Sequence, residues 1–537
     1  MQQMPTVLRT VAALASTGII EPEQLQHPDR LLRAIRTLRR WGPTPAAGYA
    51  AAAVRYPEQP AIIDELGTLT FARVQRRTNA LAHALSDTGV VEGDAIAIMC
   101  RNHRYFVETT VAASKLGADA LYLNTAFAGP QIADVLAREK PVAVVYDEEF
   151  ADLIRDGARR RKRFIAWPET PGGSGDTLLE DLIGSGDPSD VVAPERRGRV
   201  VILTSGTTGA PKGASRSQPD SLAPAAALFS KIPLRARQRT MIAAPMFHSW
   251  GFAHFTLGLA LSSTLVLRRR FDPEGTLAAT AEEHCTALIV VPVMLQRILE
   301  LPPEVIARYD LHALRVIGAS GSTLPGELAV RVMDTFGDVL YNLYGSTEVA
   351  WASIATPRDL REAPGTAGRP PMGTTVKLFD EDGVEVAPGE TGRIFVANDM
   401  LFEGYTGGGG KQVIDGLMST GDVGHFDADG RLFVDGRDDE MIVSGGENVF
   451  PREVEDGIAD MDGVAEVAVI GVLDDEFGQR LRAFVVRGPG AKPTADDIRR
   501  EVRQKLARYK VPRDVVFVEA LPRNATGKVI KRELPRD

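Results

Sequence analysis

The alternation of apolar strand-like runs with helical stretches constrains this chain more than any other feature. Six short runs have the length and the composition of buried strands: residues 95–99, 141–146, 200–203, 264–267, 287–291 and 314–317. Helical periodicity covers three of the stretches around them: residues 73–86, 129–138 and 325–335. Strands that alternate with helices predict α/β sheets with parallel strands, covered by helices on both faces.

The domain organisation follows from length and from a change of pattern along the chain. At 537 residues the chain exceeds what one hydrophobic core usually organises. After residue 375 short strands are separated by Asp/Gly/Pro turn signals, which predict hairpins and a small barrel-like β region. We therefore expect an N-terminal extension (1–45), a large N-terminal domain of α/β subdomains plus this β region (46–436), and a small mobile α+β C-terminal domain (437–537).

Charge and cysteine content exclude several classes of protein. The net charge of −9 argues against a nucleic-acid-binding protein, which would present a basic face. Cys100 and Cys285 lie far apart in apolar stretches and show neither a metal-binding spacing nor a disulfide framework. No run of about 18 apolar residues is present, and the N-terminus makes a poor signal peptide. We expect a cytoplasmic protein.

Residues 28–41 form a predicted basic amphipathic helix. Apolar residues recur at helical spacing between arginines: Leu31, Leu32, Ile35, Leu38 and Trp41, with Arg30, Arg33, Arg36, Arg39 and Arg40. Such a helix either packs on the body of the protein, the commoner case, or lies peripherally on an anionic membrane surface.

A Gly/Ser/Thr-rich loop follows the strand-like run at 200–203. Its sequence from residue 202 is Ile-Leu-Thr-Ser-Gly-Thr-Thr-Gly-Ala-Pro-Lys-Gly. Backbone N–H groups in such a loop form an anion-binding nest, hydroxyls add donors, and Lys212 adds a positive charge. Pro211 before the lysine and Gly213 after it distinguish the loop from a Walker A motif. The expected phosphate-binding residues are Thr204, Ser205, Gly206, Thr207, Thr208, Gly209 and Lys212.

Together with four later motifs, this loop resembles the signature of the adenylate-forming superfamily. That superfamily contains acyl-CoA synthetases, luciferases and peptide-synthetase adenylation domains. The later motifs are Tyr-Asn-Leu-Tyr-Gly-Ser-Thr-Glu at 341–348, Ser-Thr-Gly-Asp at 419–422, Gly-Arg-Asp-Asp at 436–439 and Pro-Arg-Asn-Ala-Thr-Gly-Lys at 522–528. The resemblance covers residues 50–537, and the composition is most similar to actinobacterial fatty-acid–CoA ligases.

The resemblance implies a first half-reaction in which a substrate carboxylate attacks the α-phosphate of ATP. Because a carboxylic acid is already ionised at neutral pH, this step needs no general base. It needs positioning and compensation of negative charge. By this resemblance, Lys528 contacts the α-phosphate and the carboxylate, Thr347 contacts the α-phosphate, and Glu348 with Thr204 binds Mg²⁺. Asp422 and Arg437 hold the ribose, and His248 lies where the acyl pocket meets the nucleotide. The remaining residues expected around the nucleotide are Gly321, Ser322, Asn342, Tyr344 and Gly345.

In the second half-reaction, by the same resemblance, the small domain rotates about a hinge at Asp439. Ser444, Gly445 and Gly446 would then line the channel for the pantetheine arm of coenzyme A. Without the family resemblance, this loop would be interpreted as a simple turn that leads into a helix before Pro451. Two positions depart from the family pattern: Glu440 stands where an aspartate is usual, and Leu417 stands near the place of a common tryptophan.

These features predict an acyl-CoA synthetase that uses ATP, Mg²⁺ and coenzyme A. The chain stops about ten residues after Lys528 and carries no carrier domain, which favours a stand-alone ligase. The expected acyl-pocket residues Gly251, Val291, Pro292, Val293 and Met294 are uncharged, so a medium- or long-chain fatty acid is favoured. Alternatives are an aromatic-acid–CoA ligase, an acyl-AMP ligase that loads a carrier protein, a luciferase-like oxidase, and a non-catalytic nucleotide sensor.

Overall fold

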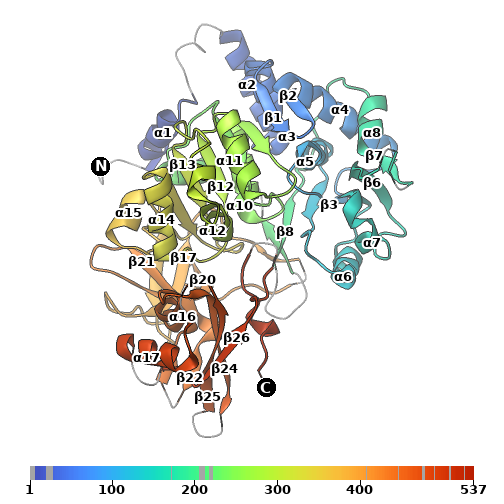
Figure 1. The fold of residues 1–537 in the computed structure, drawn as a ribbon. Helices are drawn as coiled ribbons and strands as arrows, with labels where there is room; N and C mark the ends of the chain where they lie inside the picture. Colours follow the sequence, from blue (N-terminus) through green and yellow to red (C-terminus); the bar gives the residue numbers. More distant parts are fainter. Residues whose placement is uncertain are drawn as a thin grey trace.

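The computed structural model describes most of the chain and consists of a large N-terminal part and a smaller C-terminal part (Figure 1). The described residues are 6–19, 28–170, 172–173, 175–204, 212–216, 222–406, 408–444, 447–474, 478–488, 490, 492–506, 510–524 and 527–536. The expected fold class is confirmed: two α/β sheets and a half-barrel form the large part, and a small α+β domain follows.

The first sheet has the strand order β15-β14-β13-β12-β10-β11-β1-β2. Its strands are β1 (Pro60–Asp64), β2 (Gly67–Thr70), β10 (Arg239–Ile242), β11 (Thr264–Leu267), β12 (Ala287–Val290), β13 (Val316–Ala319), β14 (Leu340–Tyr344) and β15 (Ser353–Ala355). The six inner strands run parallel, and β2 and β15 are antiparallel at the two edges. Every residue of β11, β12 and β13 is buried, which explains their continuous apolar sequence.

The second sheet has the order β18-β9-β8-β4-β3-β5-β6-β7. Its strands are β3 (Ala95–Met99), β4 (Asp119–Tyr122), β5 (Ala143–Asp147), β6 (Lys162–Trp167), β7 (Thr177–Leu178), β8 (Val200–Thr204), β9 (Lys212–Arg216) and β18 (Gly404–Tyr405). β8 and β9 pair antiparallel and enclose the phosphate loop, while β18 arrives from much later in the chain.

Helices cover both sheets. They are α4 (Phe71–Asp87), α5 (Arg104–Leu116), α6 (Gly129–Glu139), α7 (Ala151–Ile154), α8 (Leu179–Ser185), α9 (Ala223–Phe229), α10 (Ser249–Ala260), α11 (Pro273–Glu282), α12 (Pro292–Leu299), α13 (Pro303–Ile306), α14 (Gly326–Phe336) and α15 (Pro357–Glu362). The helices expected at 73–86, 129–138 and 325–335 agree with α4, α6 and α14 to within two residues. α4 begins two residues early because the Thr70 side chain caps it, accepting a hydrogen bond from the Arg73 N–H at 3.3 Å.

The half-barrel and the C-terminal domain complete the chain. The half-barrel contains β16 (Thr375–Phe379), β17 (Gly392–Ala397), β19 (Val413–Ile414), β20 (Leu417–Phe426) and β21 (Leu432–Arg437). The C-terminal sheet contains β22 (Ile442–Ser444), β23 (Glu447–Val449), β24 (Val464–Asp474), β25 (Gly478–Arg487) and β26 (Asp514–Val518), with helices α16 (Pro451–Ala459) and α17 (Ala495–Lys505). In Figure 1 the half-barrel lies between the first sheet and this C-terminal domain.

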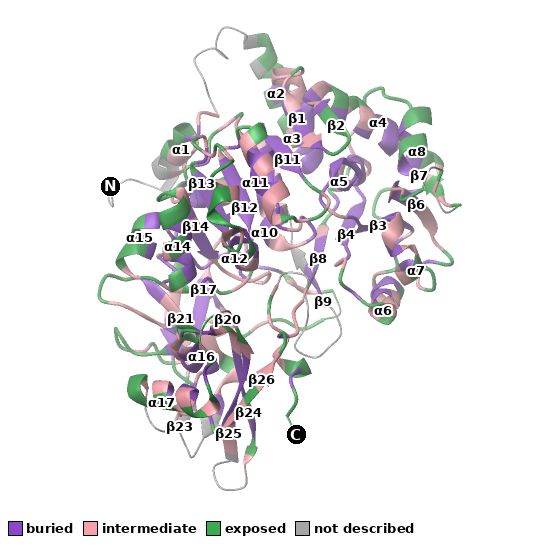
Figure 2. Cartoon of the chain, in the orientation of Figure 1, coloured by how far each residue is buried: buried purple, intermediate pink, exposed green. Residues whose placement is uncertain are grey.

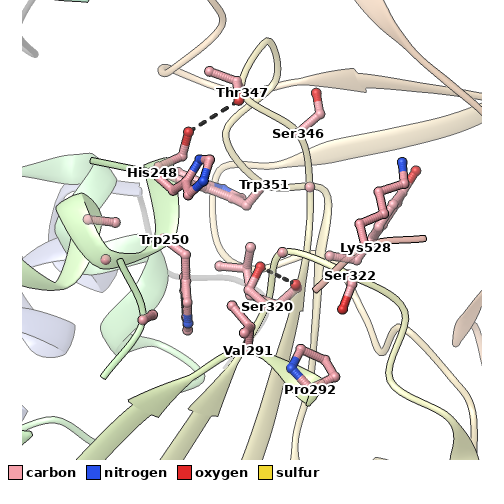
Figure 3. Close-up of a pocket in the computed structure, with 18 of the residues that line it drawn as sticks. His248, Trp250, Val291, Pro292, Ser320, Ser322, Ser346, Thr347, Trp351 and Lys528 are labelled. Carbon is pink, nitrogen blue, oxygen red and sulfur yellow. Dashed lines mark hydrogen bonds between the residues drawn. The ribbon is translucent and has the colours of Figure 1, made fainter. Parts of the chain in front are cut away.

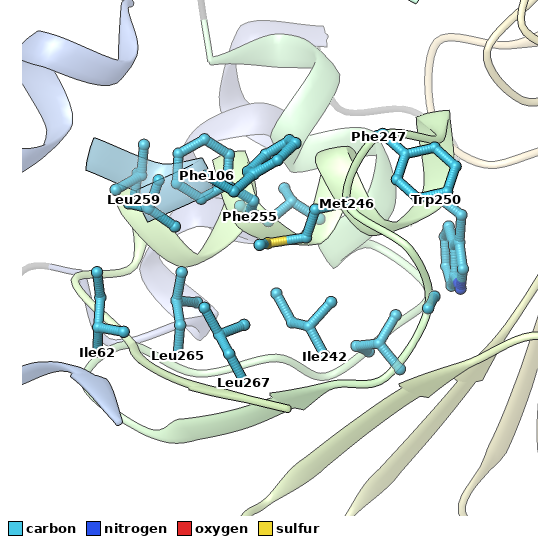
Figure 4. Packing of buried hydrophobic residues seen from close by; sticks show 14 of the residues in the cluster. Ile62, Phe106, Ile242, Met246, Phe247, Trp250, Phe255, Leu259, Leu265 and Leu267 are labelled. Carbon is cyan, nitrogen blue, oxygen red and sulfur yellow. The ribbon is translucent and has the colours of Figure 1, made fainter. Parts of the chain in front are cut away.

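Helix α10 packs on the first sheet and leads from its core to the cavity described below. Ile62, Ile242, Leu265 and Leu267 point from β1, β10 and β11 toward the helix, where Phe255 and Leu259 meet them (Figure 4). Phe106 of α5, the helix that follows β3 of the second sheet, belongs to the same hydrophobic cluster. Because α10 is anchored on this core, its N-terminal residues are held in a fixed position at the carboxyl ends of the strands.

The N-terminal extension contains α1 (Thr6–Ser16) and α2 (Pro28–Trp41), and α3 (Pro45–Arg55) begins where the extension ends. α2 spans the predicted range and packs on α3, with Ala34 and Trp41 buried. Leu32, Ile35 and Leu38 stay 54%, 38% and 45% exposed on the outside of the molecule (Figure 2). The helix therefore both packs on the protein body and presents an apolar face. Among the described residues, no helix combines the length and the apolar character needed to cross a bilayer.

Cys100 has polar neighbours that its sequence context did not reveal. Ligand atoms of Cys100, His103 and Asp147 lie within 4.8 Å of one another, and all three residues are buried. However, His103 Nδ1 accepts a hydrogen bond from the Tyr105 N–H at 3.2 Å, and its Nε2 lies 2.8 Å from Asp147 Oδ1. The first contact caps α5 and the second joins the start of that helix to the end of β5, so both imidazole nitrogens serve the fold rather than a metal ion.

Candidate active site

A cavity of about 1150 Å³ lies between the α/β sheets, the half-barrel and the C-terminal domain. Its centre lies at the carboxyl ends of β12, β13 and β14, which continue into residues 291–293, 320–323 and 345–348 of its wall. The half-barrel and the C-terminal residues 523–524 and 527–533 close it from the other side. Parallel sheets bind ligands at this edge because the loops after several strands converge there.

The phosphate loop can be placed only by its two ends. Thr204 ends β8 and Lys212 begins β9, and these two residues are opposite one another in the hairpin. The side chains of Thr204 and Lys212 lie outside the described residues. So do all of the predicted loop residues between them: Ser205, Gly206, Thr207, Thr208 and Gly209.

Thr347 and Glu348 follow β14 and lie on the cavity wall. The Ser249 hydroxyl, in the first turn of α10, donates a hydrogen bond to Thr347 Oγ1 at 3.2 Å. The Tyr405 hydroxyl on β18 donates to Glu348 Oε1 at 2.8 Å. Burial, reinforced by the Glu348 charge, raises the pKa of Tyr405, so this phenol remains a donor. The carboxylate of Glu348 is thereby oriented by the same strand that pairs with the phosphate hairpin.

The predicted nucleotide-binding residues after β13 and on β14 line one wall of the cavity. Gly321 has φ +93°, a conformation that favours glycine. At Gly345 a β-carbon would lie 2.3 Å from the Ala350 carbonyl oxygen, so only glycine fits. Asn342 is buried, and its Oδ1 has no hydrogen-bond partner in the described structure. An orphaned buried acceptor on a cavity wall is suited to a ligand N–H group.

Asp422 and Arg437 are neighbours because β20 and β21 pair them directly across the ladder. Arg437 Nη1 lies 3.4 Å from Asp422 Oδ1, and the Tyr344 hydroxyl donates to Asp422 Oδ2 at 2.6 Å. Burial raises the pKa of Asp422, while the Tyr344 hydrogen bond and the nearby cations act in the opposite direction. The structure thus joins residues from three separate motifs into one polar cluster.

Lys528 reaches this cavity from the C-terminal domain. Its backbone N–H donates to Asn524 Oδ1 at 2.9 Å, and Gly527 before it has φ +78°. A β-carbon on Gly527 would lie 2.3 Å from Val293 Cγ1, so the glycine lets the loop pack against the start of α12. Figure 3 shows the Lys528 side chain beside Ser322, across the cavity from His248 and Trp250.

His248 occupies the N-cap position of α10 and faces the cavity. Burial lowers its pKa to about 4, and its Nε2 has no partner among the described residues. The imidazole is therefore neutral at physiological pH. Trp250 donates from Nε1 to the Val290 carbonyl at 3.1 Å and forms part of the apolar wall with Val291 and Pro292 (Figure 3).

The hinge and the expected pantetheine segment are described only in part. Asp438–Glu440 form a 3₁₀ turn, but the side chains of Asp439 and Ser444 lie outside the described residues, as do Gly445 and Gly446. Ser444 pairs with Glu447 across β22 and β23, so a short strand lies between this loop and α16, the helix that the alternative interpretation expected to begin at Pro451. Glu440, the departure from the family pattern, forms an ion pair with Lys531 at 3.2 Å.

Sequence analysis missed three contributors to the cavity wall. Tyr405 holds Glu348, Lys411 lies beside Asp422, and residues 43–45, 47 and 48 reach the wall from the start of α3 and the loop before it. Leu417, by contrast, is buried against Phe379 and Phe395 away from the cavity. No local motif identifies these three, because each reaches the cavity through packing between segments far apart in the chain.

Comparison with known proteins agrees with the geometry of this cavity. The model of the AMP-binding enzyme family matches residues 49–406, and the model of the AMP-binding enzyme C-terminal domain matches residues 453–528. An indoleacetate–CoA ligase from Aromatoleum aromaticum is 34% identical over 492 residues, covering 90% of this chain and 94% of the relative. The long-chain-fatty-acid–CoA ligase FadD13 of Mycobacterium tuberculosis is 31% identical, covering 87% and 92% respectively.

A solved structure gives the same result for the fold. The crystal structure of ATP-bound MatB from Rhodopseudomonas palustris has a TM-score of 0.81 and 27% sequence identity, covering 91% of this chain and 97% of that one. The family resemblance inferred from the five motifs is confirmed. The chain belongs to the AMP-binding enzyme family, and it is an adenylate-forming ligase that uses ATP to activate a carboxylic acid and transfers the acyl group to coenzyme A.

Proposed function

We propose that the carboxylic acid is a medium- or long-chain fatty acid. The observation that carries this proposal is an apolar branch of the cavity that follows α10 away from the nucleotide wall. Ala253, Thr256 and Ala260 recur along one side of the helix and are half-buried because they face this branch. Another side of the helix, with Phe255, packs into the core. Small side chains at this spacing leave room for a ligand beside the helix.

The length and the chemistry of this branch favour an extended aliphatic tail. The 12 residues of α10 span about 18 Å, which exceeds the length of a single-ring aromatic acid. The described residues that line the branch from α3, α9 and α10 are uncharged: Pro45, Ala47, Gly48, Pro224, Ala225, Leu228, Phe252, Ala253, Thr256, Leu257, Leu259 and Ala260. A wall without charge favours a tail without a second charged group.

For the first step, we assign to Lys528 the compensation of charge on the α-phosphate and the attacking carboxylate. The carboxylate oxygen forms a bond to the α-phosphorus, and pyrophosphate leaves with the electron pair of the broken P–O bond. Thr347 donates to the α-phosphate, Asp422 and Arg437 hold the ribose, and neutral His248 separates the acyl branch from the nucleotide. Each group is placed where positioning, not proton removal, is needed.

Mg²⁺ fits the donor set of this site. Glu348 offers a hard carboxylate oxygen on the cavity wall, and Thr204 lies at the end of the strand that enters the phosphate loop. Mg²⁺ is commonly bound by one or two carboxylates together with substrate phosphates. When bound, it neutralises phosphate charge, while Glu348 and Tyr405 orient the site around it.

For the second step, we propose that the residues after Asp439 rotate as a unit about this hinge. The rotation withdraws Lys528, and the segment Ser444–Gly446 then faces the cavity as the channel for the pantetheine arm. The thiol attacks the acyl carbon and AMP leaves. The hinge lies directly after β21, so the half-barrel and the ribose residues stay with the N-terminal domain.

The aliphatic substrate is tested with a panel of acids. We expect CoA-dependent pyrophosphate release to peak on one aliphatic chain length of about eight carbons or more. Ala260→Phe, which fills the far end of the branch, is expected to reduce kcat/KM for the longest good substrate at least tenfold and to leave a short-chain acid within about twofold. Ala307→Phe, at an exposed position on the first turn after α13, is the matched control. A preference for aromatic acids, unaffected by Ala260→Phe, would contradict the aliphatic assignment.

We also propose that α2 contacts an anionic membrane surface. Leu32, Ile35 and Leu38 are exposed beside Arg36 and Arg39, and Leu38 also lines the cavity, so the apolar face is continuous with the branch along α10. We expect cosedimentation with phosphatidylglycerol vesicles that weakens with salt. The triple change of these three residues to serine is expected to reduce binding at least tenfold, whereas serine at exposed Val192 has no effect. Equal binding by both variants would exclude α2 as the contact.

A further inference from the structure

Lys411 is a cation at the nucleotide site that no motif identifies. It follows the run of glycines at 407–410, lines the cavity and is half-buried. A β-carbon on Gly421 would lie 3.2 Å from Lys411 Nζ and 3.4 Å from Arg437 Nη2. The ammonium of Lys411 and the guanidinium of Arg437 therefore converge over Gly421, immediately before Asp422.

The conformation of the loop holds Lys411 in this place. Gly408 and Gly409 have φ near +86° and +87°, which favours glycine. The Gly408 N–H donates to the Tyr405 carbonyl at 2.9 Å, and the Tyr405 N–H donates to the Gly409 carbonyl at 3.2 Å. This tight turn begins at Tyr405, whose hydroxyl binds Glu348. One residue thus anchors both the carboxylate of the site and the turn that carries Lys411.

The balance of charge around Lys411 favours an anionic ligand. Lys411 forms no ion pair among the described residues, although Asp422 is close enough for the lysine to influence its charge. Arg437 and Lys528 act on the same carboxylate, so three cations surround one buried acid. Several other acidic groups on the cavity wall have partners of their own: Glu348 accepts from Tyr405, Glu440 and Glu455 pair with Lys531, Asp456 pairs with Arg452, and Glu466 pairs with Arg523. The excess of positive charge at Asp422 suits a phosphate group.

Lys411 and Lys528 differ in the domain that carries them. Lys528 belongs to the C-terminal domain, whereas Lys411 lies between β18 and β19, in segments that pair with the phosphate hairpin and the half-barrel. We propose that Lys411 is a second cation for the α-phosphate, that it stays with the nucleotide when Lys528 is withdrawn, and that it stabilises AMP as the leaving group of the thioester step. This inference rests on the rotation proposed above.

The charge change in that step explains why such a cation is useful. The sulfur of coenzyme A forms a bond to the acyl carbon, the bond from that carbon to the phosphate oxygen breaks, and its electron pair leaves with AMP. The thiol proton passes to solvent. The phosphate charge rises from about −1 in the acyl-adenylate to nearly −2 in AMP. A lysine held on the N-terminal side compensates this added charge in the transition state.

The two half-reactions, measured separately, test the assignment. Acyl-AMP formation is followed by acid-dependent pyrophosphate exchange, and thioester formation is followed in a single turnover from preformed acyl-AMP and coenzyme A. We expect Lys411→Gln to slow thioester formation about tenfold to hundredfold and acyl-AMP formation less than about threefold. Lys411→Arg is expected to restore most of the rate. Lys377→Gln, at an exposed lysine of the half-barrel paired with Glu385, is the control.

Calorimetry of AMP and adenosine binding tests the phosphate contact of Lys411 independently of the acyl transfer to coenzyme A. We expect Lys411→Gln to weaken AMP binding about tenfold and to leave adenosine binding unchanged, whether or not coenzyme A is the acceptor. Unchanged AMP affinity, or an equal loss of AMP and adenosine affinity, would overturn the phosphate role. A wild-type enzyme that makes acyl-AMP but no acyl-CoA would instead refute coenzyme A as the acceptor. The AMP-binding measurement would still decide whether Lys411 binds the phosphate.

Discussion

Lys528→Ala is expected to slow acyl-AMP formation by about 10²–10³-fold, while the reaction of preformed acyl-AMP with coenzyme A keeps a rate within about threefold of wild type. The lysine side chain lies in the cavity beside Ser322, on a loop that packs against α12 through Gly527. Removing it leaves the negative charge of the α-phosphate and the attacking carboxylate uncompensated. Pyrophosphate exchange and single-turnover thioester formation measure the two steps separately.

The control for this variant is a lysine of the same domain that lies away from the cavity. Lys505 on α17 forms an ion pair with Glu501 at 3.0 Å, and Lys505→Ala is expected to leave both half-reactions within about twofold. Equal losses in the two half-reactions of Lys528→Ala would show that the lysine serves both steps. That result would contradict a division of labour between Lys528 and Lys411.

Glu348→Gln is expected to lower kcat/KM for ATP about 100-fold and to raise the Mg²⁺ concentration needed for half-maximal rate. Glutamine keeps the shape of the side chain and still accepts the hydrogen bond from Tyr405, so the change isolates the lost charge. The measurement is the initial rate of pyrophosphate release over a Mg²⁺ titration at saturating acid and coenzyme A.

Tyr405→Phe provides the comparison that separates orientation from charge. The phenol donates to Glu348 Oε1 at 2.8 Å, and its loss leaves the carboxylate charged but less well oriented. We expect a loss of about tenfold, smaller than that of Glu348→Gln, and a smaller shift of the Mg²⁺ dependence. A Glu348→Gln enzyme with an unchanged Mg²⁺ dependence would refute the metal role of Glu348.

Much of the fold was predictable because it depends on local patterns. The strand-like runs at 95–99 and 264–267 coincide with β3 and β11, and the helix at 28–41 coincides with α2. The carboxyl edge of a parallel sheet collects the loops after its strands, so the motif residues Tyr344, Thr347 and Glu348 reach one cavity wall once the topology is given.

Contacts between distant segments were not predictable from those patterns. Tyr405 reaches Glu348 only because β18 adds to the sheet of the phosphate hairpin, some 190 residues away from its partner strand β9. The same holds for Asp147, which reaches Cys100 and His103 through the pairing of β3 with β5. The spacing of residues along the sequence does not indicate which strands will be neighbours in a sheet.

The sequence by itself determined the reaction class of this protein. The order of five motifs placed the chain among the adenylate-forming enzymes, because binding and activating the nucleotide requires those residue types in any arrangement of the chain. The tertiary structure alone decided which further residues reach the cavity. Residues 43–48 reach the acyl branch because α3 packs on α10, where Gly48 allows close contact with Leu259. Lys411 meets Asp422 because a glycine turn follows β18. Packing, register and backbone conformation fix these contacts, and each depends on the whole fold.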